Sequence, residues 1–176
     1  MFSDPQENIG ALELEAGLNV IDVGAGVGHH TILIAKTVGA SGHVYAVDVQ
    51  KELLVKLQND AKSAHLHNIT IVHGNAEKLG GTRLKEGIAD RIFISNVFFQ
   101  IDHKESFVSE MRRLLSSGGK LVLVDWIDAL GSSEAHGKMV VGPLEAEHLF
   151  EIGGFKKASS FEAGSHHYGL VFKKTH

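Results

Sequence analysis

Three glycines and an aspartate are the residues of this chain whose spacing predicts chemistry. Gly24, Gly26 and Gly28 follow an apolar run, and Asp48 ends the next apolar run twenty residues after the last glycine. Such glycines predict a sharp strand-to-helix turn with positive φ, where a ligand approaches the backbone without a Cβ in the way. A carboxylate at the end of the next strand can accept both hydroxyls of a ribose. Together they predict a site for a nucleoside-containing cofactor.

The spacing of the glycines narrows the kind of cofactor. A dinucleotide fingerprint reads G-x-G-x-x-G and places a pyrophosphate on the helix N-terminus. Here the glycines form G-x-G-x-G, and His29 stands where the third dinucleotide glycine would be. No Gly-Lys-Ser/Thr follows, which excludes a P-loop. A nicotinamide-dependent oxidoreductase is disfavoured by this spacing and stays a rival.

The segment Asp22–Gly28, read as D-V-G-A-G-V-G, resembles motif I of the class I S-adenosylmethionine-dependent methyltransferases. Two later segments match the same family in order. Gly74–Leu79 resembles its G-D-A-E-x-L stretch, with Asn75 in place of the aspartate, and Asp90–Asp102 resembles its motif IV. The resemblance extends from about Val20 to Lys173. Within the family, the sequence looks most similar to the ubiquinone/menaquinone-biosynthesis type.

This resemblance implies S-adenosylmethionine as cofactor and S-adenosylhomocysteine as product. In the family, the motif I turn meets the methionine part, the carboxylate after the second strand holds the ribose, and the residue at Asn75 accepts a hydrogen bond from the adenine amino group. An amide oxygen can still accept that bond, although it carries no charge. The implied cofactor-binding residues are Asp22, Gly24, Ala25, Gly26, Gly28, Asp48, Val49, Asn75, Ala76, Asn96 and Val97.

The elements that must position these residues alternate between apolar strands and amphipathic helices, a pattern typical of βαβ units and a parallel sheet. We expect strands at 19–23, 43–48, 69–73, 90–95 and 120–125, helices at about 29–38, 51–64, 102–115 and 143–152, and a terminal hairpin of 155–161 with 168–173. The resemblance implies a three-layer α/β/α sandwich around a seven-stranded, mostly parallel sheet of order 3-2-1-4-5-7-6. Residues 1–176 are expected to form a single domain.

Composition bounds the class of protein. The 176 residues are 43% hydrophobic and 22% charged, which is typical of a globular domain with a real core. The net charge of −4 argues against a large generic phosphate-binding surface, although a local basic patch remains compatible with it. The chain has no cysteine, no apolar run long enough for a membrane span and no signal-peptide pattern at its start, so we expect a cytoplasmic protein.

The twelve histidines do not identify a catalytic base or a metal site. Neighbours in a strand point to opposite faces, so His166 and His167 cannot both bind one ion, and no H-E-x-x-H occurs. No metal is therefore expected. By rough location His29, His103, His136 and His167 are candidates for a base, and the catalytic residues stay unknown.

The sequence predicts transfer of a methyl group from S-adenosylmethionine to an unidentified acceptor, with a small organic molecule preferred over a protein or RNA. Little chain precedes the first strand, so we expect an open site, which a homodimer or a partner subunit would complete. Gly131 and Gly137 are expected to let the segment after the fifth strand close over substrate. A subunit that binds cofactor but is active only with a partner, and an inactive scaffold, remain alternatives.

Overall fold

The computed structural model describes residues 5–127 and 140–175. Its helices are α1 (Pro5–Gly10), α2 (His29–Val38), α3 (Lys51–Ser63), α4 (Lys104–Leu114) and α6 (Pro143–Ile152), with a 3-10 turn η1 (Phe98–Gln100). Its strands are β1 (Asn19–Val23), β2 (His43–Asp48), β3 (Ile69–His73), β4 (Ala89–Ser95), β5 (Leu115–Trp126), β6 (Phe155–Glu162) and β7 (His167–Lys174). None of the helices in these ranges is both long and apolar enough to cross a membrane.

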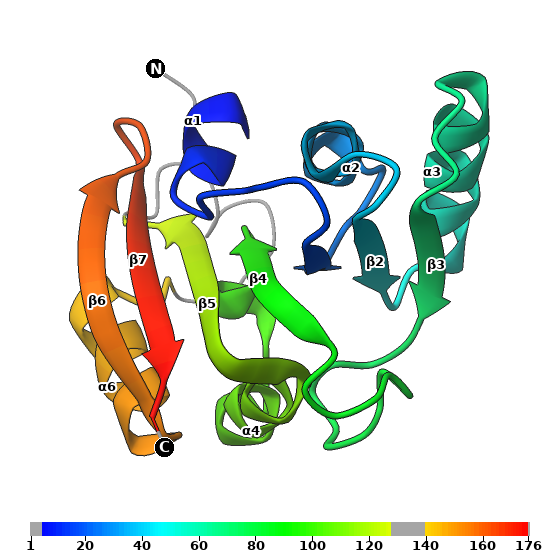
Figure 1. Ribbon diagram of the computed structural model, residues 1–176. Helices are drawn as coiled ribbons and strands as arrows, with labels where there is room; N and C mark the ends of the chain where they lie inside the picture. Colours follow the sequence, from blue (N-terminus) through cyan, green and yellow to red (C-terminus); the bar gives the residue numbers. More distant parts are fainter. Residues whose placement is uncertain (1–4, 128–139, 176) are drawn as a thin grey trace.

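All seven strands join one sheet of order β3-β2-β1-β4-β5-β7-β6 (Figure 1). The first five strands pair in parallel, whereas β7 is antiparallel to both β5 and β6 and lies between them. The predicted fold class and strand order are confirmed. The order reverses direction between β1 and β4, which is the switch point where open α/β sheets bind ligands.

Helices cover both faces of the sheet, because its central strands are apolar on both sides. In β4, Ile92, Phe93 and Ile94 are all fully buried, as expected of a strand between two helical layers. Phe93 belongs to the core shared with α1 and α2, and Ile92 to the core shared with α4 and α6. Figure 1 shows α4 and α6 on the opposite side of the sheet from α1.

Several boundaries differ from expectation by one or two residues, and the largest difference lies between α4 and β5. The helix predicted to reach Leu115 ends at Leu114, and β5 begins at Leu115 instead of Lys120. The extra strand residues pair with the start of β4 across a register shift between Ala89 and Arg91. The pair Gly118-Gly119 follows the predicted helix and would by itself predict a helix end. Gly118, with φ of 77°, instead lies within this irregular stretch, so both glycines are part of a bulged strand.

Helix α1 was not expected, because six residues carry too little periodicity to predict a helix. Pro5 opens it, at the position where a missing N–H is tolerated. Ile9 and Leu12 at its end are buried against the face that carries α2. The N-terminal residues therefore cover part of the sheet instead of forming only a lead-in to β1.

Candidate functional site

A cavity of about 290 Å³ opens at the carboxyl ends of β1, β2 and β4. We call it the switch-point cavity, because it lies where the strand order reverses between β1 and β4. Its wall is made by the turns that follow the first four strands, and it continues to Phe107 on α4. Open α/β sheets bind nucleotide-like ligands at this place.

The three motif I glycines have left-handed φ angles of 74°, 55° and 90°, and each serves a different contact. A Cβ at Gly24 would collide with the side chain of Val97, and one at Gly28 would collide with Leu57 of α3. A Cβ at Gly26 would meet no atom within 4 Å. Gly26 also lines the cavity, so it is the glycine that leaves room for a ligand, whereas Gly24 and Gly28 permit close packing.

The carboxylate of Asp48 lies on the cavity wall and is almost fully buried. Its Oδ2 accepts a hydrogen bond from the Gly26 amide at 2.8 Å, and its Oδ1 accepts one from the Gln50 amide, also at 2.8 Å. A carboxylate oxygen has two lone pairs. Each oxygen therefore keeps one acceptor position, which is the number needed for the two hydroxyls of a ribose.

Asp22, the first residue of the predicted motif, does not line the switch-point cavity. It is buried behind the turn, where its Oδ2 accepts a hydrogen bond of 2.6 Å from the Thr31 hydroxyl. Burial, together with the nearby charge of Asp48, raises the pKa of Asp22 to about 6. Because Thr31 lies in the first turn of α2, this bond fixes the start of that helix against β1.

Another wall of the cavity, where the sequence predicts the adenine ring, is formed by the segment after β3, which contains no helix between His73 and Ala89. Asn75 and Ala76 line the cavity. The Asn75 Oδ1 accepts a hydrogen bond of 2.8 Å from the Glu77 amide, which leaves the second lone pair of that oxygen for another donor.

A buried ion pair fastens this segment to α4. Glu110 is 0% exposed and accepts hydrogen bonds from the Gly80 amide at 2.7 Å and the Thr82 hydroxyl at 2.5 Å. Arg113 contacts both of its oxygens at 2.8 Å. Burial raises the pKa of Glu110, but the bonds from Arg113, Thr82 and Gly80 outweigh burial and hold it below its ordinary value. The wall around Asn75 therefore depends on α4.

The turn after β4 supplies the wall opposite Asp48. Asn96 has a left-handed φ of 57° and lines the cavity together with Val97. Its Oδ1 is buried and has no hydrogen-bond partner among the described residues. A buried acceptor without a donor is costly, so this position fits a ligand that brings an N–H group, such as the ammonium of an amino acid.

The aromatic residues that follow do not all reach the cavity. Phe98 and Phe99 are buried in the core, and the Phe98 ring lies 5.3 Å from that of Phe150 on α6. The motif IV resemblance would place Phe98, Phe99 and Gln100 at the opening of the site. That expectation is wrong for the two phenylalanines, because of the three only Gln100 lines the cavity. The buried Asp125 accepts hydrogen bonds from the Phe99 and Trp126 amides, which holds this turn against the end of β5. Burial raises the pKa of Asp125 to about 6.

The histidines are dispersed. His29 and His103 are exposed at the starts of α2 and α4, and the His167 ring lies 4.0 Å from that of Trp126. Burial, and then the nearby His29, lowers the pKa of His30 to about 4. His136, Gly131 and Gly137 lie outside the described residues. Within residues 5–127 and 140–175, no three His, Asp or Glu side chains lie together as a metal site would need.

Most of the predicted site converges on one cavity. Eight of the eleven predicted residues line it: Gly24, Gly26, Asp48, Val49, Asn75, Ala76, Asn96 and Val97. Asp22, Ala25 and Gly28 are not among its lining residues, and the Ala25 amide donates to the Val47 carbonyl. The sequence missed Leu53 and Phe107 of the lining, because a helical apolar residue gives the same signal whether it faces the core or a cavity. Binding of cofactor by any of these residues stays a prediction.

Known proteins resemble this chain in sequence and in fold. Residues 14–154 match the family model of the methyltransferase domain. A demethylmenaquinone methyltransferase of Listeria welshimeri is 29% identical over 120 residues, which is 68% of this chain and 50% of that protein. An arsenite methyltransferase of Aquipseudomonas alcaligenes is 32% identical over 154 residues, 79% of this chain and 44% of that protein. The chain thus spans about half the length of these curated relatives.

The fold agrees with the sequence match. The crystal structure of a SAM-dependent methyltransferase from Aquifex aeolicus superposes with a TM-score of 0.85 at 25% identity, covering 97% of this chain and 89% of that one. These findings confirm the predicted family. The chain belongs to the methyltransferase domain family, on the Rossmann-like fold of the S-adenosylmethionine-dependent enzymes.

Proposed function

We propose that this chain binds S-adenosylmethionine in the switch-point cavity and transfers its methyl group to a small organic acceptor. One observation carries the assignment of the cavity. Asp48 is buried on the wall, each of its oxygens accepts a single backbone hydrogen bond, and the Gly26 turn beside it leaves open space. A ribose diol fits such a carboxylate. The other carboxylate that lines the cavity, Glu77, already accepts hydrogen bonds from the Asp102 and His103 amides with one oxygen.

The other lining residues fit the rest of the cofactor. Asn75 and Ala76 lie where the adenine ring is expected, and the unpartnered Asn96 Oδ1 fits the ammonium of the methionine part. S-adenosylmethionine supplies, when bound, a methyl group already activated by a positive sulfur. The task left to this chain is alignment, because an in-line displacement gains much of its rate from orientation. The Gly26 amide is held by the Asp48 carboxylate and the Asn96 amide by the Val124 carbonyl, which suits that task.

A small acceptor is supported by the names of the relatives, which are methyltransferases of demethylmenaquinone and of arsenite. The chain spans only about half of those proteins, so the acceptor of this chain has to be found by experiment. We further propose that residues 1–176 act as one domain in the cytoplasm, supported by the single sheet from Asn19 to Lys174 and by the absence of cysteine. A second copy or a partner would cover the acceptor side of the site.

Calorimetric titration of the purified chain with S-adenosylmethionine, S-adenosylhomocysteine and NADH tests the proposal. We expect micromolar binding of the first two and none of NADH. Homocysteine release would then be followed with hydroquinones and arsenite as acceptors, first with the chain alone and then with added protein extract. Binding of NADH alone, or of none of the three, would contradict the proposed cofactor site.

A further inference from the structure

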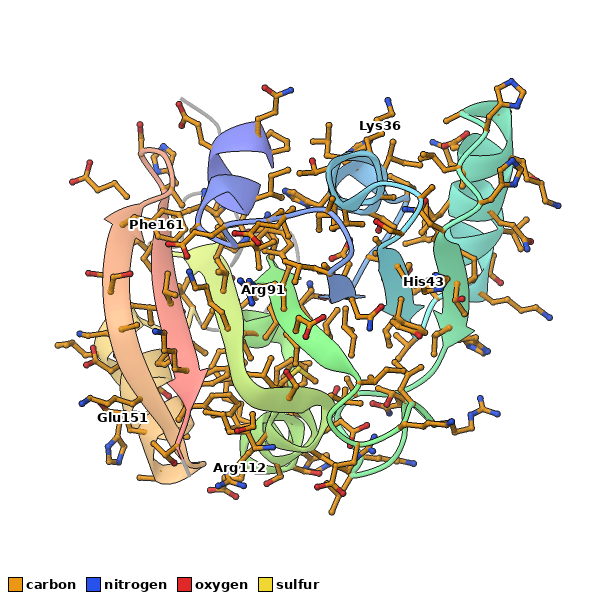
Figure 2. All side chains as sticks on the ribbon, viewed as in Figure 1. Lys36, His43, Arg91, Arg112, Glu151 and Phe161 are labelled. Atoms are coloured by element: carbon orange, nitrogen blue, oxygen red, sulfur yellow. The ribbon has the colours of Figure 1, made fainter. Side chains whose placement is uncertain are left out.

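A row of basic side chains crosses the sheet at the end opposite the switch-point cavity. Arg91 of β4 is in register with Lys120 of β5, and Lys120 is in register with Lys173 of β7. Residues in register lie on the same face. Two positions along each strand from this row, Phe93, Val122 and Val171 belong to the core that α1 and α2 cover, so the row lies on that face. Arg91 is labelled in Figure 2.

One carboxylate of the chain reaches into this row. Glu13, after α1, places its Oε2 2.5 Å from the Lys120 Nζ. The hydrogen bond and the charge of Lys120, followed by the charges of Arg91 and Lys173, hold the pKa of Glu13 below its ordinary value. All three cations therefore act on a single carboxylate. That side chain is 74% exposed, whereas the side chain of Lys120 is only 10% exposed.

The row lines a hollow of about 290 Å³ whose other walls are Ser159, Val171 and Gly118. A second hollow of about 360 Å³ shares Glu13, Lys120, Ser159 and Val171 and extends to Phe161 and α1. The Glu13–Lys120 pair belongs to both. Neither hollow shares a lining residue with the switch-point cavity.

The basic side chains of this row have hydrogen-bond donors and positive charge that no other group of the described residues neutralises. Arg91 donates its Nε to the Leu12 carbonyl and its Nη1 to the Asp90 carbonyl, and its Nη2 has no partner in the described part of the chain. Lys173 is exposed and, within the same ranges, bonds to no carboxylate. Three cations facing one carboxylate leave an excess of positive charge in a protein whose net charge is −4.

We propose that Arg91, Lys120 and Lys173 form a binding site for a small phosphate-bearing anion, and that the Glu13 carboxylate occupies this site until the anion displaces it. A phosphate group offers several oxygens to donors arriving from different strands, and Arg and Lys are its usual partners. The Ser159 hydroxyl adds a neutral donor. The apolar surface of Val171 and Phe161 beside the row favours an organic phosphate over the free ion.

Pyrophosphate, inorganic phosphate and phenyl phosphate are the probes for this site. Each is titrated into the ¹⁵N-labelled chain at constant ionic strength while amide shifts are recorded. We expect saturable shifts at Gly118–Lys120, Ser159 and Lys173. In Glu13→Gln, which removes the internal competitor, each probe should bind about tenfold more tightly. If phenyl phosphate binds more tightly than inorganic phosphate, the ligand is an organic phosphate. If the two bind equally, the ligand is the free ion.

Two matched lysine variants in the Glu13→Gln background decide whether the row itself is responsible. Lys173→Ala should weaken pyrophosphate binding about tenfold, whereas Lys36→Ala on α2 should leave it unchanged. Glu13→Gly is a second way to remove the carboxylate, since position 13 has a left-handed φ of 49° that glycine adopts freely. No saturation, no tightening in either Glu13 variant, or equal effects of the two lysines would overturn the proposal. S-adenosylhomocysteine affinity should not change in any of these variants, so the outcome is independent of the proposed cofactor site.

Discussion

Replacing Asp48 by alanine separates a ribose-binding carboxylate from a merely structural one. In the folded chain its two oxygens each accept one backbone hydrogen bond of 2.8 Å and keep one free acceptor position. Two hydroxyl bonds to a charged acceptor would each contribute about 1.5 kcal/mol at the lower end of the usual range. The loss is reduced because water enters the space left by the side chain. We therefore expect S-adenosylhomocysteine binding to weaken by roughly 1–3 kcal/mol, or about 5- to 150-fold.

The assay is calorimetric titration of the wild type and of Asp48→Ala with S-adenosylhomocysteine, after a thermal melt has shown each to be folded. The melt matters because the same substitution removes the bonds to the Gly26 and Gln50 amides. Asp60→Asn is the matched control, since Asp60 is an exposed aspartate on α3 that does not line the cavity. An unchanged affinity in folded Asp48→Ala would refute the placement of the ribose.

The remaining predictions concern the turn that contains Gly26 and Gly28, the buried carboxyl group of Asp22, and the ion pair between Glu110 and Arg113. Gly28→Ala should lower the melting temperature because its Cβ collides with α3, whereas Gly26→Ala should chiefly weaken S-adenosylhomocysteine binding because its Cβ enters the cavity; equal melting losses without a difference in binding would contradict this division. Because the pKa of Asp22 is raised to about 6 in the folded chain, its protonated carboxyl group stabilises the fold below pH 4. This contribution to the free energy of unfolding is lost as the pH rises through 6, by about 1.4 kcal/mol per pH unit. The free energy of unfolding of Asp22→Asn, measured with urea at pH 4 and pH 6, should not show that loss. A pH dependence equal to that of the wild type would refute the prediction. Arg113→Met should destabilise the chain by about 3–5 kcal/mol, because it leaves Glu110 buried without its cation; urea unfolding measures this, and a loss below about 1 kcal/mol would show that the pair is dispensable.

The strands were predicted well because apolar runs bounded by glycine are a strong local signal. Five helix and strand ranges, including Ile69–His73 and Pro143–Ile152, were predicted without error at either end. Errors occurred where the local signal was ambiguous. Gly118 read as a helix end because a glycine pair after an amphipathic stretch usually terminates a helix, and only the pairing of Leu115 with Ala89 reveals the strand.

The site was predicted at the level of turns, and less well at the level of single side chains. Spacing places Gly24 and Asn96 on neighbouring turns, but it does not say that Val97 fills the space a Gly24 Cβ would need. Phe98 and Phe99 follow a strand end that lines the cavity, yet they are buried in the core because the chain turns at once into η1. The Glu110–Arg113 clamp was not predicted, since a charged pair on an amphipathic helix usually lies in solvent.

The position of β7 between β5 and β6 determines when the sheet can be completed during synthesis. Every residue that lines the switch-point cavity lies between Val23 and Phe107, so the cavity is encoded well before the hairpin. Yet β5, which supports β4 on one edge, pairs on its other edge only with β7, which is synthesised after the six other described strands. Until His167–Lys174 emerges from the ribosome, β5 presents an unpaired apolar edge through Leu121–Val124, a surface that invites pairing with another chain. A nascent chain with a nearly finished cavity is therefore also the form most prone to aggregate.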